Sequence, residues 1–398
     1  MPPTKLAAAL AVLAGAAAFT PQAMAAGVDG ASPLKTAADA YRSAYPQLSA
    51  AQAATAAAEQ PSRKALYESV PLSRYGGAWY DAPSNTVHLN ATTQAAADAA
   101  EARGRELDLR VVTTVVSRTF ADLQEQADSL RGGALGENVG IDVKTNRVVA
   151  AVPASQRASL TAPAGVALID DPGSNSVPDA CTSRTACDTS VRAGTVLWRG
   201  SQGSNVCSNG FTLRDPNTNI RWATTAGHCS NGALVTWGTS IGTIGPLIAS
   251  MNSGAVDASA IWISDPAYSG QAGHQIYRHA AFGGTVQVDA AANLLTDMTV
   301  GDTVCLSANF TDVTGGNLCG VLGSTSDPGN RGLARVDGMD ACGGDSGGGW
   351  YGLSGSTRTA YGFHSRSSST CHAAGGTSWF SAWAVVHSAL LPGADVEL

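Results

Sequence analysis

Gly344-Asp345-Ser346-Gly347-Gly348 decides how the rest of the chain is interpreted, because it sets one serine in a loop almost free of side chains. A serine hydroxyl is a weak nucleophile and needs a neighbouring base to take its proton. Glycines let backbone N–H groups approach a substrate carbonyl, and one such donor to an oxyanion is worth on the order of 3 kcal/mol. The loop therefore indicates acyl transfer, provided that the chain also supplies a base and a group that orients it.

A candidate base stands in Thr224-Thr225-Ala226-Gly227-His228-Cys229, where a β-rich run ends at a histidine in a tight glycine turn. Asp257 is the best candidate to orient this histidine, because it leads into the apolar run Ala258–Ile263, which would bury its carboxylate. Asp265 ranks second, since the proline after it gives it a turn-like setting. The candidates thus follow the order histidine, aspartate, serine.

These two motifs, A-G-H-C and G-D-S-G-G, resemble in their order the chymotrypsin clan of serine proteases, and in detail the secreted bacterial branch of alpha-lytic protease and the streptogrisins. The resemblance implies an all-β fold of two six-stranded antiparallel β-barrels with a C-terminal helix. A small α+β prodomain would precede the barrels. The implied activity is hydrolysis of peptide bonds through an acyl-enzyme.

Carried over residue by residue, the resemblance makes Ser346 the nucleophile and His228 the general base and then acid. Asp257 would hold the histidine in its useful tautomer. The backbone N–H groups of Gly344 and Ser346 would form the oxyanion hole. Ser365 matches the family serine that hydrogen-bonds the triad aspartate and opens the substrate-binding strand.

Asp345 matches the buried carboxylate that fixes the oxyanion loop in this family. The family arginine that pairs with this carboxylate is replaced by Leu306. The candidate partners that remain are Arg331, Arg335 and an N-terminus freed by processing.

The substrate pocket is expected to prefer basic side chains. Asp340 lies six residues before Ser346, the spacing at which trypsin-like enzymes place the aspartate at the pocket base. A buried aspartate would favour arginine or lysine by charge pairing. Ser365, Arg366 and Ser367 would also line the pocket, where Arg366 could fill or neutralise it and Ser367 could narrow it.

All eight cysteines lie between residues 181 and 371, and an even number in an exported chain indicates disulfides. Eight cysteines allow 105 pairings from sequence alone. No C-x-x-C pair is present, and His274 and His279 lack a second metal-ligand signature, so we expect no metal and no cofactor. The pairs that the resemblance selects are Cys207–Cys229, Cys305–Cys319 and Cys342–Cys371, which leaves Cys181–Cys187 as a local pair.

The N-terminus has the order of a secretory signal peptide: Lys5, the apolar run Leu6–Phe19 and an A-x-A site at Ala23-Met24-Ala25. We therefore expect a secreted protein. The predicted layout is a signal peptide over 1–25, a prodomain over 26–170, a linker with the local disulfide over 171–191, and a protease domain over 192–398.

Within the predicted prodomain, D-x-x-x-N-x-V occurs at Asp81–Val87 and again at Asp142–Val148, which predicts two similar hairpins with polar turns. The alanine-rich stretch Thr36–Glu59 favours helix, as does the apolar spacing within Ser117–Leu130. Pro153–Pro178 has little periodicity and is typical of a linker.

The predicted protease domain alternates short β-rich runs with Gly, Ser and Asn turns, which is typical of a β-sandwich or barrel. Only its last segment, Trp383–Leu391, has the apolar spacing of a helix. The expected strands are Thr195–Trp198, Ile220–Thr225, Ala258–Ile263, Thr285–Val288, Thr303–Leu306 and Thr357–Phe363.

Composition excludes several other classes. The 398 residues carry a net charge of −7 and only 14% charged side chains, so there is no basic footprint for nucleic acid. We expect peptide or protein substrates, the chain's own prodomain as partner in cis or in trans, no membrane association after signal removal, and a monomer. One alternative is a catalytically silent, protease-like binding module, although such modules usually lack a triad member. Another is an esterase, although the usual G-x-S-x-G elbow of esterases stands on a strand–helix turn, and the setting here is β-rich.

Overall fold

The computed structural model describes residues 33–398 with internal gaps. The gaps are 131–134, 136–137, 158–159, 171–176, 179–190, 201–205, 231–234, 240–241, 266–267, 269–273, 278–285, 310–318, 355–356, 369–370 and 372–374. The expected signal peptide, the Cys181–Cys187 pair and His279 lie outside the described residues.

Helices open the described chain: α1 (Pro33–Ala44), α2 (Ala50–Ala58) and α3 (Gln60–Glu68). The alanine-rich stretch predicted as helical forms α1 and α2 rather than one helix. The interruption falls at Pro46, because proline lacks the N–H that a helix interior requires. Ser49 then starts α2 with a capping box, which satisfies N–H groups that the first turn leaves unpaired.

The two predicted hairpins are present, and each turns at an asparagine. Asn85 and Asn146 have φ of 48° and 51°, a left-handed conformation that asparagine tolerates. A further strand then joins each hairpin in parallel, so that two three-stranded sheets form. The elements are β1 (Tyr75–Asp81), β2 (Thr86–Ala91), α4 (Gln94–Glu106), β3 (Val111–Val115), α5 (Phe120–Leu130), β4 (Val139–Asp142), β5 (Arg147–Val152), α6 (Ala154–Arg157) and β6 (Val166–Asp170).

The stretch interpreted as linker-like, Pro153–Pro178, contains α6 and β6, both of which lie within the predicted prodomain over 26–170. Strand β5 pairs with β6 in parallel along the whole length of β6. Its own burial falls off toward the end of the strand.

The C-terminal part of the chain contains a closed barrel. Six antiparallel strands run in the order β22-β21-β18-β19-β20-β23, and β23 pairs back with β22. Helix α9 follows the last of these strands, as predicted. The elements are β18 (Thr303–Ser307), β19 (Cys319–Asp327), β20 (Leu333–Asp337), β21 (Gly349–Ser354), β22 (Thr357–Ser367), β23 (Thr377–Ala382) and α9 (Trp383–Leu390).

A second sheet, in the order β24-β10-β11-β14-β13-β12-β8-β9, curls into a half-barrel beside the first. In the described residues its end strands, β24 and β9, do not pair with each other. The all-β fold class predicted from sequence is confirmed, but the second sheet is an eight-stranded half-barrel in the described residues, and not the six-stranded barrel that was predicted. The elements are β8 (Val196–Arg199), β9 (Val206–Ser208), β10 (Leu213–Arg214), β11 (Arg221–Thr225), α7 (Gly227–Ser230), β12 (Thr236–Thr239), β13 (Gly242–Ser253), β14 (Val256–Trp262) and β24 (Asp395–Val396).

Short elements complete the chain. Strand β17 joins β22 in parallel at the edge of the barrel sheet, and β15 pairs with β16. They are β7 (Val177–Pro178), β15 (Gln275–Ile276), β16 (Val286–Gln287), β17 (Ala290–Ala291), and the 3-10 helices η2 (Leu295–Asp297) and η3 (Pro328–Asn330).

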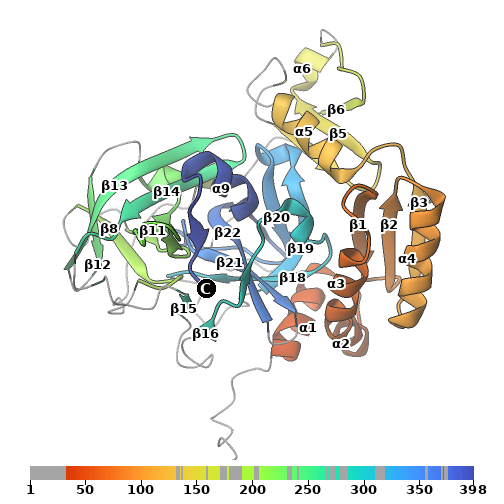
Figure 1. Ribbon diagram of the computed structural model, residues 1–398, viewed down its shortest axis with the longest axis horizontal. Coiled ribbons are helices and arrows are strands. Elements are labelled where there is room, and N and C mark those ends of the chain that lie inside the picture. The colour runs from red at the N-terminus through yellow and green to blue at the C-terminus, as the bar shows by residue number, and fades with distance from the viewer. Residues whose placement is uncertain are drawn as a thin grey trace, which may run out of the picture.

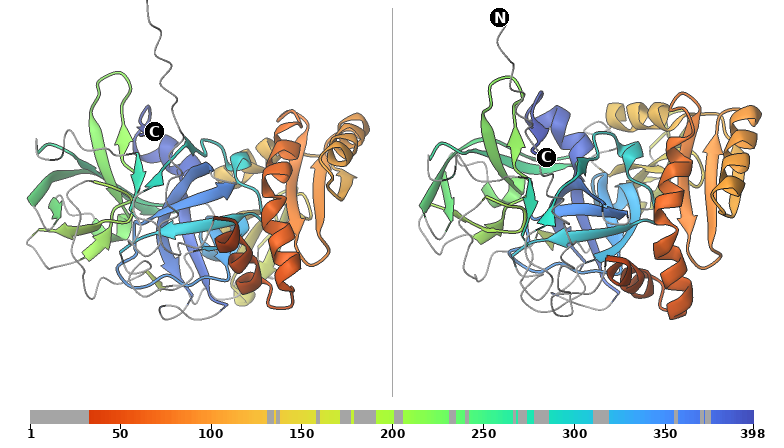
Figure 2. Two further views of the ribbon diagram at one scale, coloured as in Figure 1. Left: turned by 90° about the horizontal axis from the view of Figure 1, so that it is seen from below. Right: turned by 60° about the horizontal axis from the view of Figure 1, so that its bottom comes forward.

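The N-terminal elements pack against the closed barrel, and the half-barrel lies on the barrel's other side (Figure 1). In the views of Figure 2, α1 and α3 lie along the flank of the barrel that carries β18 and β19. One hydrophobic cluster spans this boundary, since it joins Tyr41 and Leu66 with Val304 and Trp350. The two parts of the chain therefore share a continuous core.

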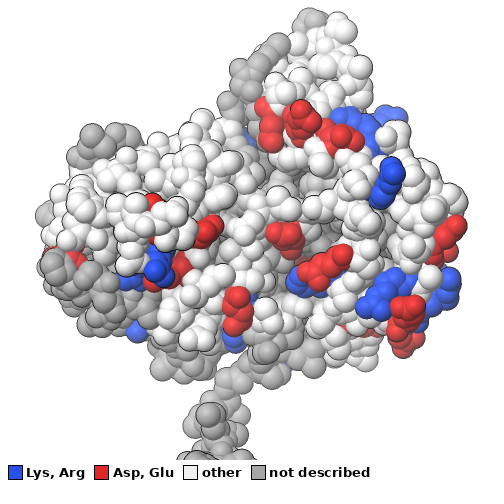
Figure 3. All heavy atoms as spheres, in the orientation of Figure 1, with Lys and Arg blue, Asp and Glu red and all other residues white. Residues whose placement is uncertain are grey.

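Charged side chains are unevenly distributed on the face shown in Figure 3. Lysine and arginine gather over the region of α4, whereas the surface over β13, β14 and α9 is mostly uncharged. Within the described residues, no helix combines the length and apolar character needed to span a membrane.

Candidate active site

His228 lies in α7, the single turn that follows β11. The backbone of this turn is close to its neighbours, because a Cβ on Gly227 would lie 1.9 Å from the carbonyl oxygen of Met251. The His228 N–H donates to Asp257 Oδ1 at 2.8 Å, and the ring Nδ1 lies 2.7 Å from Asp257 Oδ2. Both the backbone and the ring of His228 are thus fixed on one carboxylate, which sets the ring orientation.

Asp257 is fully buried at the start of β14. Its Oδ2 also accepts a hydrogen bond from Ser365 Oγ at 2.5 Å. Burial disfavours its charge, but the nearby His228 and the hydrogen bonds from His228 and Ser365 hold the pKa of Asp257 below its usual value. The structure joins this aspartate to His228, whereas the backbone carbonyl of Asp265, the second candidate, accepts a hydrogen bond from the N–H of Tyr268 at 3.0 Å.

Ser346 completes the group, with its Oγ 2.9 Å from His228 Nε2. It stands in the loop before β21 of the closed barrel, while His228 and Asp257 come from the half-barrel. Gly347 has φ of +88°, and a Cβ there would lie 2.3 Å from Thr225 Oγ1. Glycine therefore lets the serine loop press against β11, which brings the three predicted residues together.

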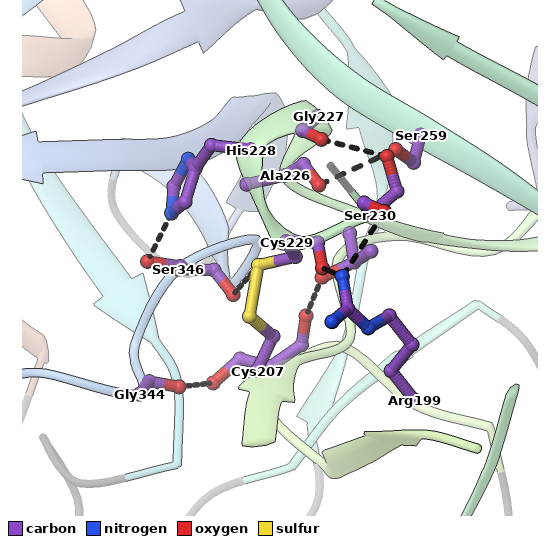
Figure 4. Close-up of a disulfide and its surroundings, with 12 residues drawn as sticks. Arg199, Cys207, Ala226, Gly227, His228, Cys229, Ser230, Ser259, Gly344 and Ser346 are labelled. Atoms are coloured by element: carbon purple, nitrogen blue, oxygen red, sulfur yellow. Dashed lines mark hydrogen bonds between the residues drawn. A yellow bond between two sulfur atoms is a disulfide. The ribbon is translucent and has the colours of Figure 1, made fainter. Parts of the chain in front are cut away.

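Strand β9 contacts both loops. Cys207 forms a disulfide with Cys229, the residue after His228, and Figure 4 shows this disulfide between the histidine and serine loops. The next residue, Ser208, donates from its Oγ to the carbonyl of Gly344 and from its N–H to the carbonyl of Ser346, both at 2.8 Å. Two carbonyls of the serine loop are thereby fixed by one residue of the half-barrel.

Further contacts hold the histidine loop from both sides (Figure 4). Arg199 Nη1 donates to the carbonyls of Cys229 and Ser230 at 3.3 and 3.1 Å, at the end of α7. Ser230 Oγ lies 2.6 Å from Ser250 Oγ, which accepts from Ser259 Oγ at 2.9 Å. Sequence reasoning missed Ser208, Arg199 and these hydroxyls, because such residues occur in any β-strand and form no motif.

Asp345 is fully buried and accepts from the N–H of Cys342 at 2.8 Å. In the described part of the chain, Arg331 hydrogen-bonds Asn252 at 3.1 Å and Arg335 pairs within its own strand, so neither candidate arginine is bonded to Asp345.

Asp340 is buried, and its Oδ1 accepts from Ser368 Oγ at 3.0 Å and from the N–H of Thr377 at 3.1 Å. Ser367, also buried, donates to the carbonyl of Ala341 at 3.2 Å. The predicted pocket residues are therefore held between β22, β23 and the segment that leads into the serine loop.

The edge of β22 beside this region is paired. Strand β7 runs antiparallel to it, with Pro178 opposite Arg366 and Val177 opposite Ser367. The chain that leaves the N-terminal part thus runs along the strand that contains Ser365.

Three of the predicted disulfides are present: Cys207–Cys229, Cys305–Cys319 and Cys342–Cys371. One adjoins His228, one precedes the serine loop, and one joins β18 to β19. Among the described residues, no group of three or more His, Cys, Asp or Glu side chains is arranged to hold a metal ion.

The closed barrel, the half-barrel and the C-terminal helix together define a chymotrypsin-like fold. No family model and no curated protein matches the chain. Among solved structures, it is similar to a glutamic-acid-specific serine protease described as using a novel histidine triad in substrate binding, with 23% identity over 50% of this chain and 96% of that chain, and a TM-score of 0.40. It is also similar to an alpha-lytic protease homolog, with 22% identity over 50% of this chain and 98% of that chain, and a TM-score of 0.38.

Proposed function

We propose that this chain is a secreted serine endopeptidase, made as a preproprotein, which cleaves peptide bonds through Ser346, His228 and Asp257. One observation carries the proposal: Ser346 Oγ, the His228 ring and the Asp257 carboxylate form a continuous line of contacts at 2.9 and 2.7 Å. This is the geometry in which an imidazole activates an alcohol.

In the proposed reaction, Ser346 Oγ attacks the carbonyl carbon of the peptide bond while its proton passes to His228 Nε2. The carbonyl oxygen becomes an oxyanion that the N–H groups of Gly344 and Ser346 stabilise. The C–N bond breaks as His228 returns the proton to the leaving amine, and water then repeats the sequence on the acyl-enzyme. Asp257 remains ionised throughout, in keeping with the direction of its pKa, and holds the protonated imidazole.

The N-terminal part, residues 26–170, is proposed to act as a prodomain that assists folding and inhibits. The continuous core with the closed barrel supports the folding role. For the uncut chain, the pairing of β7 with β22 supports inhibition, because β7, in the predicted linker after the prodomain, occupies the strand edge along which a peptide substrate would lie. The proposed partners are this prodomain and peptide substrates.

Secretion is proposed from the predicted signal peptide, and three disulfides fit an oxidising compartment. The mature form is proposed to be a monomer without a cofactor.

Labelling with a covalent active-site serine reagent tests the proposed function. The processed protein should form one adduct, at Ser346, and should hydrolyse peptides as well as esters. No adduct on the processed protein would favour a silent binding module, while ester hydrolysis without peptide hydrolysis would favour an esterase.

We also propose that the pocket prefers basic side chains because of Asp340, and Asp340→Asn tests this preference. The substitution keeps acceptors for Ser368 and Thr377 but removes the charge. Cleavage after arginine and lysine should fall by about tenfold to a hundredfold relative to other sites, the value of a hydrogen bond to a charged group. A peptide-library profile measures this. A wild-type profile confined to small or aromatic residues would contradict the preference.

Ser208→Ala tests the support of the oxyanion loop. Without its Oγ, the Gly344 carbonyl loses its donor and the Asn309 N–H loses its acceptor, both in a buried setting. We expect kcat to fall about tenfold with KM little changed, less than the loss of an oxyanion donor itself. Ser208→Thr, which keeps a hydroxyl, should recover much of the rate. Equal losses in both variants, or a change in KM alone, would contradict the role.

A further inference from the structure

A buried ion pair joins the N-terminal part of the chain to the closed barrel. Arg63 of α3 is 0% exposed, and its Nη2 lies 3.6 Å from Oδ1 of Asp302, the residue before β18. The carboxylate is 7% exposed. No other contact between these two parts in the described residues joins buried opposite charges.

The arginine is well held by its own part of the chain. Nη1 donates to the carbonyl of Ala56 at 2.9 Å, and Nη2 donates to Tyr41 Oη at 2.6 Å. The guanidinium carbon lies 3.8 Å from the centre of the Tyr80 ring, so the charge also rests on an aromatic face. These contacts keep Arg63 in place whether or not a carboxylate faces it.

The contacts beside the ion pair are neutral hydrogen bonds. Tyr41 Oη donates to the carbonyl of Gly301 at 2.7 Å. Gln60 Oε1 accepts from the N–H of Thr303 at 3.2 Å, and Tyr80 donates from its backbone to Val300 at 3.0 Å. These hydrogen bonds fix the position of the N-terminal part on the closed barrel, and their strength does not depend on pH.

The negative charge of Asp302, by contrast, has too few partners to offset the cost of its burial. Its Oδ1 is buried without a hydrogen bond, and 3.6 Å to Arg63 is an ion-pair distance beyond hydrogen-bond range. Its backbone is fixed within the barrel, since its carbonyl accepts from Leu322 at 2.8 Å, so the carboxylate cannot easily move to a better partner. A buried carboxylate with one partial partner retains a large desolvation cost.

We propose that Asp302 makes the hold of the prodomain on the protease depend on protonation: the two stay together when this carboxylate is neutral and separate more readily when it is ionised against Arg63. The inference rests on the proposed function, because it concerns how long the inhibited complex survives after the chain is cut. The partner of Asp302 is Arg63 of the prodomain, which Tyr41 and Tyr80 hold in place.

The sign follows from the groups that face Asp302. Burial raises the pKa of its carboxyl to about 6, although Arg63 and Lys64 lower it. Five tyrosines also interact with it, and burial raises the pKa of each, so they stay neutral near pH 7: Tyr41, Tyr67, Tyr75, Tyr80 and Tyr361. Exposed to water after separation, the carboxyl returns to about 4.

Association of the prodomain with the protease domain therefore takes up a proton at Asp302. This proton stabilises the complex in acid, and the stabilisation is lost as the pH rises through about 6. With a pKa of about 6 for Asp302 in the complex and about 4 after separation, the affinity of the prodomain for the protease domain should fall about tenfold between pH 5 and pH 7.5.

The test uses the full chain with Ser346→Ala, which removes self-cleavage, and a recognition sequence for an unrelated protease inserted between residues 171 and 176. After that protease has cut the chain, gel filtration and dilution measure how fast the two pieces separate. The measurement needs no activity from this protein, so its outcome is independent of the proposed catalysis.

The wild-type pair should separate about tenfold faster at pH 7.5 than at pH 5. Asp302→Asn should separate slowly at both values. Arg63→Met should separate faster than wild type at pH 7.5, with a smaller difference at pH 5, whereas Arg103→Met, an exposed arginine of α4, should change nothing. Burial also raises the pKa of Asp337 in β20. Because Asp337 is present in wild type and in every variant, its contribution to the separation rate cancels when the variants are compared with wild type at the same pH.

The inference is overturned if the wild-type pair separates at the same rate at both pH values, or if Asp302→Asn keeps the full pH dependence. It is also overturned if Asp302→Asn separates faster than wild type at pH 7.5, because the ionised pair would then hold the complex. If Arg63→Met does not fold, Asp302→Asn still tests the inference, because it leaves Arg63 and its contacts with Ala56, Tyr41 and Tyr80 unchanged.

Discussion

Ser346→Ala is expected to lower kcat for peptide hydrolysis by about six orders of magnitude, to the residual rate that binding and an oxyanion hole provide. The reason lies in one contact, the 2.9 Å between Ser346 Oγ and His228 Nε2. Without the hydroxyl there is no atom to form the acyl bond, and the imidazole has no proton to take. Steady-state kinetics on the secreted, processed protein measure the loss.

Because self-processing would also stop, this variant should accumulate as the uncut chain and needs cutting by an added protease before assay. Ser388→Ala, a change on the exposed face of α9, is the matched control and should keep full activity. The double variant with Ser346→Ala and His228→Ala should have a kcat only slightly below that of Ser346→Ala alone, since the residues act as a unit. A Ser346→Ala protein with more than a small fraction of wild-type turnover would contradict the mechanism.

Asp257→Asn is expected to lower kcat by about four orders of magnitude with the fold intact. The carboxylate accepts from both the backbone N–H and the ring of His228, at 2.8 and 2.7 Å, and from Ser365. An asparagine would present an amide N–H to one of these donors, which favours the tautomer that cannot take the proton of Ser346. Kinetics together with a thermal unfolding curve separate this effect from a loss of folded protein.

Asp265→Asn is the matched control, because sequence alone left that aspartate as an alternative and its backbone carbonyl accepts from Tyr268. It should retain nearly full activity. The assignment of Asp257 would be wrong if the two variants lost activity to a similar extent, or if Asp265→Asn were the slower.

The elements that sequence reasoning predicted well are those with a local cause. The turn asparagines of the two hairpins, the apolar strand after Asp257 and the helix over Trp383–Leu390 each have their own pattern. His228, Asp257 and Ser346 were found because motifs mark them, and the structure brings their side chains within hydrogen-bond distance.

What sequence reasoning missed depends on contacts between distant segments. Strand β6 pairs in parallel with β5, a partner that its own short apolar run does not specify. Ser208 is one serine among many until the fold places it against Gly344, and Arg63 is an ordinary helix arginine until Asp302 faces it. Neither has a local signature, since each is defined by a partner more than a hundred residues away.

The placement of two cross-links bears on where this chain can be active. Cys229 follows His228 directly, and Cys342 lies at the start of the segment that carries Ser346. In a cytoplasm that keeps thiols reduced by glutathione, both segments would lack their covalent ties. We therefore expect the proposed peptidase to be inactive while the chain stays in a reducing cytoplasm, and to become active only when these disulfides form after the proposed export.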